Sequence, residues 1–376
     1  MNLSDRNGSR EGKPDWLCSF PYVNGGLFLG TSHTPKFNGA SLSYLLDAGK
    51  LSWKMINPDI FGSMIQTIVN SNERGELGMH YTSVPNILKV LNPLFLNSLR
   101  EDVEAHWNSK KGLQDVLRRL TKIRVFDPAC GSANFLVIAY REMREIEIKV
   151  LVRLQAISSD TARTWSHVEL KNFCGIELRD FAAETAKLAL WIAEHQMNRR
   201  FEEAFGSISP ELPLKDGGNI IRGNALRIDW KSVCAPPTDP ETETYVVGNP
   251  PYMGYNKQSA DQKGDLELVC SKYVNNWKSI DYVSGWIFKS ADFISNNRSS
   301  AAIVTTNSIN QGENAHLIWG PLFEQGIEII FAYRSFKWTN NAAKGAKESS
   351  PFPSMKYFGS FPRRDSSDLE SDRNRF

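Results

Sequence analysis

The feature that most constrains the fold of this 376-residue chain is an alternation of short apolar runs with helical segments, beginning near residue 122. Six runs carry the β-branched and aromatic residues typical of strands: "KIRVFD", "NFCGIE", "GNIIRG", "TYVVG", "SSAAIVTT" and "GIEIIFA". Segments between them, such as "FAAETAKLALWIAEHQM", place apolar residues at helical spacing. Strands that alternate with helices predict an α/β fold with a mostly parallel sheet that helices cover on both faces.

The residues of unusual type nearly all follow one of these strands. The carboxyl ends of parallel strands meet at one edge of a sheet, and open α/β sheets bind their ligands beyond that edge. We therefore expect the functional site at the ends of the strands.

The pattern differs on both sides of this region. Residues 1–15 are polar and predict a disordered start, and residues 16–75 predict a helical spacer. Apolar residues at helical spacing begin at Val84, inside a predicted catalytic domain of residues 76–341. Residues 342–376 lose periodicity and are rich in Ser, Lys, Arg, Asp and Pro, which predicts a disordered or aberrant tail.

The composition is that of a globular protein, with 41% hydrophobic and 23% charged residues. The net charge of +2 neither supports nor excludes a nucleic-acid partner. No apolar run is long enough to span a membrane, and the polar start is not a secretory signal, so we expect a cytoplasmic protein without a membrane partner. The five cysteines form no CxxC pair, which favours neither a metal site nor a disulfide framework.

The first motif is "VFDPACGSANF". Asp127 ends a predicted strand, Gly131 allows a ligand to approach the backbone closely, and a helix begins near Asn134. The motif has neither GxGxxG nor a GK[ST] ending, and an acid at the strand end repels phosphate. An acid there attracts an ammonium or sulfonium group, which favours S-adenosylmethionine over NAD or ATP. The alternative is an ordinary tight strand-to-helix turn.

Three further positions are candidates for cofactor contacts. Glu177 ends the second strand, where a carboxylate can accept both hydroxyls of a ribose, although its separation from Asp127 exceeds the roughly 20 residues of a tight dinucleotide-binding unit. Asn224 in "IIRGNAL" can hydrogen-bond an adenine ring, and Tyr81 and Thr82 precede a predicted helix. The alternatives are a solvent-facing acid, a turn asparagine and a helix cap.

The segment "YVVGNPPYMGYN" follows the fourth strand. Two adjacent prolines stiffen the chain, so Asn249, Pro250, Pro251 and Tyr252 form an extended, rigid piece. The Asn249 side-chain oxygen and the Pro250 carbonyl can accept the two N–H bonds of an aromatic amine, and the Tyr252 ring can stack on its base. Such a base must be flipped out of a duplex. The alternative is a simple strand stop.

These motifs together resemble a known family. "DPACGSANF" followed by "NPPY" resembles the amino-group DNA methyltransferases, and the order of the two motifs is similar to the gamma class of N6-adenine enzymes. "FPYVNGGLF", "INPDIFGSMIQ" and "GMHYTSVPNILKVLNPLFL" look like the fused restriction–modification proteins of the MmeI type. The resemblance covers residues 14–341 and implies a Rossmann-like S-adenosylmethionine-dependent methyltransferase sheet with a helical N-terminal lead-in.

The resemblance assigns roles to the candidate residues. The catalytic motif it implies consists of Asn249, Pro250, Pro251 and Tyr252, and no metal is implied. The cofactor residues it implies are Tyr81 and Thr82 at the amino acid end, Asp127, Ala129, Gly131 and Asn134 in the main loop, Glu177 at the ribose and Asn224 near the adenine. Phe331 or Phe336 is expected to supply a second aromatic face for the flipped base.

The implied function is that of an adenine-N6 DNA methyltransferase core of a restriction–modification or phage-defence system. Its cofactor is S-adenosylmethionine, and its partners are double-stranded DNA and a separate recognition or nuclease subunit. Two alternatives remain, a truncated remnant that only binds cofactor or a partner and an N-methyltransferase of a protein amide. One departure is Ala133, where the family usually has glycine, and we expect its methyl group to lower cofactor affinity.

Overall fold

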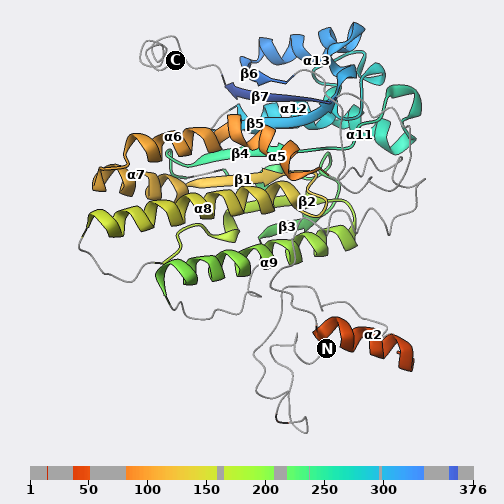
Figure 1. Cartoon of the computed structure of the whole chain (residues 1–376). Coiled ribbons are helices and arrows are strands. Elements are labelled where there is room, and N and C mark those ends of the chain that lie inside the picture. Colours follow the sequence, from red (N-terminus) through yellow and green to blue (C-terminus); the bar gives the residue numbers. More distant parts are fainter. Residues whose placement is uncertain are drawn as a thin grey trace.

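In the described part of the chain, seven strands form one sheet in the order β3-β2-β1-β4-β5-β7-β6 (Figure 1). In this computed structural model the described residues are 15, 37–50, 82–158, 165–206, 218–236, 238–295 and 299–333, and 355–362 for the backbone alone. The strands are β1 (Ile123–Asp127), β2 (Phe173–Glu177), β3 (Asn219–Arg222), β4 (Glu243–Gly248), β5 (Ser299–Thr306), β6 (Ile327–Ala332) and β7 (Met355–Pro362).

The six strands predicted from the sequence are all present, and β1 to β5 pair in parallel. The seventh strand, β7, pairs antiparallel with both β5 and β6. It lies within the segment expected to be a disordered tail, so that expectation is wrong for residues 355–362. The polar composition of the whole tail led to this expectation, although the tail contains one short apolar and aromatic run, "MKYFGSFP". The strands that pair with this run lie far away in the sequence. The other domain boundaries stay predictions.

Side chains alternate between the two faces of the sheet, and each face has its own apolar core. In β4, Tyr245 and Val247 belong to one core cluster and Val246 to the other. In β5, Ala302 packs on the first face and Ala301 on the second. Burial on both faces is what a parallel sheet covered by two helical layers requires.

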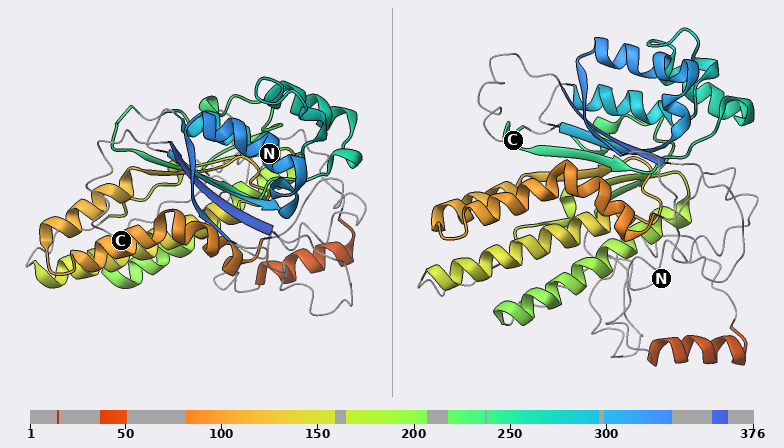
Figure 2. Two further views of the ribbon diagram at one scale, coloured as in Figure 1. Left: turned by 90° about the horizontal axis from the view of Figure 1, so that it is seen from above. Right: turned by 45° about the horizontal axis from the view of Figure 1, so that its top comes forward.

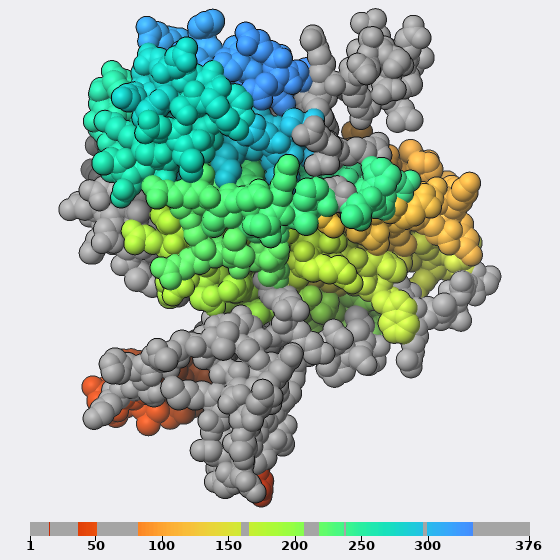
Figure 3. Space-filling view, turned by 180° about the vertical axis from the view of Figure 1, so that it is seen from behind, coloured from red at the N-terminus to blue at the C-terminus, as the bar shows by residue number. Residues whose placement is uncertain are grey.

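Helices cover both faces, as Figures 1 and 2 show. Those of the first face are α5 (Val84–Leu91), α6 (Asn97–Ala105), α7 (Lys110–Thr121), α8 (Asn134–Ile157) and α9 (Asp180–Phe205). Those of the second are α10 (Trp230–Val233), α11 (Ala260–Cys270), α12 (Ser284–Ile294) and α13 (Gly312–Glu324). The teal and blue helices α11 to α13 form the upper part of the molecule seen from behind (Figure 3).

The chain enters the sheet through a helical lead-in. Helix α2 (Gly39–Lys50) buries none of its residues, and most of the predicted spacer lies outside the described residues. Helix α5 continues through a π-helical turn, Asn92–Leu96, into α6. Pro93 lies in this turn and has no N–H to donate, which accounts for the altered hydrogen-bond ladder. Among the described residues, none of the helices combines the length and the hydrophobicity that a membrane span requires.

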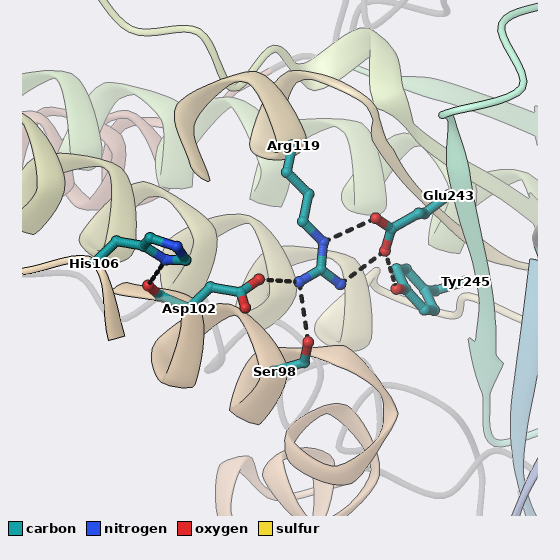
Figure 4. A network of polar contacts seen from close by, with 6 residues as sticks. All are labelled: Ser98, Asp102, His106, Arg119, Glu243 and Tyr245. Atoms are coloured by element: carbon teal, nitrogen blue, oxygen red, sulfur yellow. Dashed lines mark hydrogen bonds and ion pairs between the residues drawn. The ribbon is translucent and has the colours of Figure 1, made fainter. Parts of the chain in front are cut away.

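A hydrogen-bond network around Arg119 connects helices α6 and α7 to the start of β4 (Figure 4). Arg119 on α7 donates two hydrogen bonds to Glu243, at 2.8 and 2.9 Å, and one of 2.7 Å to Asp102 on α6. It also donates to Ser98 at 3.0 Å, and the Tyr245 hydroxyl donates to Glu243. The side chains of Arg119 and Glu243 are 24% and 19% exposed, so the pair is largely removed from water.

We expect Arg119→Ala to lower the free energy of unfolding by about 3 kcal/mol, because it leaves the Glu243 carboxylate desolvated and without its bidentate partner. Arg118 supplies the matched control, since its side chain is 61% exposed and pairs with Asp115 on the same helix. Arg118→Ala should cost less than about 0.5 kcal/mol. Urea unfolding measures both, and equal losses would show that the network contributes nothing specific.

Candidate active site

A cavity of about 810 Å³ opens at the carboxyl ends of β1, β2, β3 and β4. The strand order reverses between β1 and β4, and α/β sheets bind ligands at such a switch point. Nine of the fourteen candidate residues line this cavity: Thr82, Asp127, Ala129, Gly131, Asn134, Glu177, Asn224, Asn249 and Pro251. They come from stretches far apart in the sequence, so the topology brings them together.

The other candidates lie elsewhere. Pro250 and Tyr252 flank the cavity-lining Pro251 but are not part of the lining, and the Tyr252 ring packs against both core clusters. Tyr81 lies outside the described residues, as does Phe336. Phe331 packs against the first core cluster from β6 and does not line the cavity.

Asp127 is the deepest acid of the cavity, at 1% exposure. Its carboxylate accepts a hydrogen bond of 3.0 Å from the Ala129 N–H. It also lies against the end of β4, where a Cβ on Gly248 would come within 2.6 Å of Asp127 Oδ1. Burial, with a smaller contribution from the nearby Glu177 charge, raises the pKa of Asp127 to about 8. Only a glycine at 248 leaves room for this carboxylate.

The loop after β1 contains two residues in the left-handed region, Gly131 at φ 54° and Ala133 at φ 64°. Ala133 is fully buried in the first core cluster and does not line the cavity. Its methyl group therefore packs in the core, which differs from the expectation that it meets the ligand. Its unusual φ, rather than contact with a ligand, is the reason why glycine suits this position.

Glu177 has a structural role that the sequence did not indicate. One carboxylate oxygen accepts the Gly131 N–H at 3.0 Å, and the other accepts the Arg179 N–H at 2.9 Å. The end of β2 thereby fixes the loop after β1. Burial raises the pKa of Glu177, while these backbone N–H groups lower it.

Asn249 lies directly after Gly248, the residue of β4 that lies against Asp127 at the end of β1. Its Nδ2 donates to the Thr82 hydroxyl at 3.3 Å. Its Oδ1 is buried and has no hydrogen-bond partner among the described residues. The acceptor of this side chain is therefore unsatisfied within the described part of the chain. Thr82 also lines the cavity, and its place at the cofactor's amino acid end stays a prediction.

The chain after Tyr252 is fixed by residues that sequence reasoning missed. The Met253 N–H donates to Asp281 Oδ1 at 3.1 Å, and its carbonyl accepts from the Tyr282 N–H and from Gln258 Nε2. Asp281 also accepts the Val283 N–H. No local sequence signal marks Asp281 or Gln258, because both act through tertiary contacts.

Asn224 follows β3 and is held at both ends of its amide. Its Nδ2 donates to Asp265 at 2.9 Å, and its Oδ1 accepts the Leu226 N–H at 2.9 Å. Asp265 also lines the cavity, although no motif includes it.

This sheet, with an acid ending β1, an acid ending β2 and an Asn-Pro-Pro-Tyr segment after β4, defines the class of Rossmann-like methyltransferases. The chain belongs to the family of the MmeI DNA-methyltransferase domain, whose family model matches residues 103–349.

Relatives support the same family. DNA methyltransferase A of Bacillus subtilis (strain 168) is 45% identical over 344 residues, which are 91% of this chain and 39% of that protein. The type II restriction enzyme and methyltransferase RM.Eco57I of Escherichia coli is 27% identical over 191 residues, 46% of this chain and 18% of that protein. The solved structure of the type IIL restriction-modification enzyme MmeI with DNA superposes with a TM-score of 0.83 at 37% identity, covering 96% of this chain and 48% of that one. The chain thus spans less than half the length of each of these proteins.

Proposed function

We propose that this chain transfers a methyl group from S-adenosylmethionine to the N6 amine of a flipped-out adenine in double-stranded DNA. In this proposal it is the methylation core, residues 76–341, of a cytoplasmic restriction–modification or phage-defence protein. The observation that carries the proposal is the buried Asn249 Oδ1, which has no partner among the described residues and lies beside the cavity that also contains Asp127. Membership of the MmeI methyltransferase-domain family supports the type of reaction.

The cavity fits this cofactor by the chemistry of its lining. Two acids, Asp127 and Glu177, suit an ammonium group and a ribose better than a phosphate. Each oxygen of Glu177 already accepts one N–H and keeps a second lone pair for a ribose hydroxyl. When bound, S-adenosylmethionine supplies a methyl group on a positively charged sulfur. We assign Gly131 and Asn134 to the amino acid end and Asn224 to the purine.

The groups that bind the target amine lie in the segment after β4. An aromatic amine is a weak nucleophile, because its lone pair is delocalised into the ring. Asn249 Oδ1 accepts one N–H and the Pro250 carbonyl the other, which returns electron density to the nitrogen. The two prolines and the anchored Met253 keep these acceptors in place. Tyr252 is assigned to stack on the base.

The nucleic-acid partner is inferred from relatives. The solved MmeI enzyme was captured in complex with DNA. A base inside a duplex cannot reach a cavity at the end of a sheet, so the target must leave the helix. The gamma-like order of the motifs favours adenine, and we propose that a separate recognition or nuclease subunit supplies sequence selection.

The test has two stages. Calorimetry with S-adenosylhomocysteine should show one site per chain, and tritium from labelled S-adenosylmethionine should enter mixed-sequence duplex DNA. Digestion and mass spectrometry should then identify N6-methyladenine. N4-methylcytosine would overturn the assignment to adenine, binding without transfer would identify a cofactor-binding remnant, and absence of binding would overturn the proposed function.

A further inference from the structure

A buried acid outside every sequence motif lines the cavity. Asp265 on α11 is 3% exposed. Its Oδ2 accepts Asn224 Nδ2 at 2.9 Å and the Tyr282 hydroxyl at 2.7 Å, and its Oδ1 accepts Arg227 Nε at 2.6 Å. The donors come from the turn after β3 and from the segment that leads into α12. Each oxygen of this carboxylate therefore has a partner.

These contacts determine the orientation of the Asn224 amide. A carboxylate paired with a guanidinium only accepts hydrogen bonds, and the Leu226 N–H on Asn224 Oδ1 only donates. Rotating the amide by 180° would set donor against donor and acceptor against acceptor. The Nδ2 group has a second hydrogen beyond the one given to Asp265, so Asn224 can offer a donor to a ligand.

The backbone around Asn224 is fixed as well. The Ala225 carbonyl accepts Trp230 Nε1 at 2.8 Å and Lys289 Nζ at 2.7 Å. The Asn224 carbonyl accepts the N–H groups of Arg227 and Ile228. The turn is therefore rigid, and the orientation of the Asn224 amide depends on its two side-chain contacts, with Asp265 and with the Leu226 N–H.

We propose that Asp265 is a positioning residue that holds the Asn224 amide as a donor to one ring nitrogen of the cofactor's purine. This inference rests on the proposed function, since it names how the same cavity recognises adenine. Asp265 acts through Asn224 and does not itself contact the reacting atoms. It thereby sets the specificity of the site for a base that presents an acceptor at this point.

The experiment measures binding by calorimetry for S-adenosylhomocysteine and its 1-deaza, 3-deaza and 7-deaza analogues, each of which lacks one ring nitrogen. In the wild-type protein one analogue should bind about tenfold or more weakly, because a buried donor loses its acceptor. We call this loss of affinity for one deaza analogue, relative to S-adenosylhomocysteine, the penalty. Asp265→Asn should reduce the penalty to below about threefold, since the Asn224 amide is then no longer held. Asn224→Ala should remove the same penalty.

The chain offers a matched control at Asp292 on α12. Its carboxylate accepts Lys272 Nζ at 2.8 Å and the Tyr273 hydroxyl, which repeats the combination of acid, cation and tyrosine away from the cavity lining. Asp292→Asn should keep the full penalty. If Asp265→Asn does not fold, Arg227→Gln replaces it, because that side chain is 56% exposed and also contacts Asp265; it should give an intermediate penalty.

Each contrary outcome is distinct. If Asp265→Asn weakens all four ligands equally and keeps the penalty, Asp265 is only structural and the inference is overturned. If no analogue is penalised in the wild-type protein, the Asn224 contact is wrong, although binding of S-adenosylhomocysteine still supports the proposed function. If that ligand does not bind, the proposed function itself fails.

Discussion

Asn249→Ala is expected to slow methyl transfer to DNA by about 10²–10³-fold, the range seen when one preorganised group is removed from a reacting centre. The reason lies in the buried Asn249 Oδ1, which no group of the described protein satisfies. In our proposal this oxygen accepts an N–H of the target amine, and that hydrogen bond strengthens as the nitrogen attacks. The cofactor should still bind within about threefold, because Asp127 and the loop after it are held by other contacts.

Asn249→Asp is the informative comparison, since it keeps an acceptor of the same size at this position. It should recover at least about tenfold of the rate lost in Asn249→Ala. Single-turnover transfer of tritiated methyl groups measures the rates, and calorimetry measures cofactor affinity in each variant. Equal losses in the two variants, or an unchanged rate in Asn249→Ala, would refute the assignment of Asn249 as an acceptor.

The protein without cofactor is expected to lose thermal stability as pH rises from about 4 to 8, and Asp127→Asn to lose much less. The pKa of Asp127 is raised from 3.8 to about 8, chiefly by burial. Between these values the folded state holds a proton that the unfolded state has released, so unfolding becomes easier with increasing pH. Above about pH 8 the contribution is fully lost. The pKa values of Glu177 and Asp281 are also raised, so the stability of Asp127→Asn should still fall slightly as pH rises.

Cofactor affinity should change in the opposite direction. The ammonium group of the cofactor's amino acid end is best matched by the ionised form of Asp127, so binding should strengthen by up to about tenfold per pH unit between pH 6 and 8. The Asp127→Asn variant should bind the cofactor weakly at every pH, and its affinity should not increase between pH 6 and 8. Scanning calorimetry and titration calorimetry follow the two quantities, and a wild-type slope retained in Asp127→Asn would exclude Asp127 as its source.

Most of the fold could be predicted from local sequence patterns. Each predicted strand is a β-branched run whose neighbours in the sequence are turn residues or helices, so the six runs could be recognised one at a time. The meeting of Asp127 and Asn249 also followed, because the ends of parallel strands share one edge. Strand β7 was missed, since it forms only between two strands that the local sequence does not identify as its partners.

The site residues that were not predicted from the sequence have one thing in common. Their roles depend on contacts between segments that are distant in the sequence. Asp265 and Asp281 have no motif around them, and only the folded chain shows that they hold Asn224 and Met253. Ala133 was expected to face the ligand, but its backbone conformation directs it into the core.

Helix α9 shows the same limit in its packing. Its apolar residues at helical spacing predicted the helix, yet the large Phe181 is 60% exposed while the small Ala186 and Ala189 are fully buried. Small residues allow α8 and α9 to approach closely, and a periodicity based on size does not detect them.

The position of β7 also bears on how the protein is made. It is the last of these strands to leave the ribosome, yet it occupies an interior place between β5 and β6. The nascent chain can pair β1 to β5 as they emerge, whereas the strand that pairs with β6 in the described sheet, residues 355–362, is translated later. The half of the sheet that carries the cavity can therefore assemble first, and the far edge is completed by threading a late segment between two earlier ones.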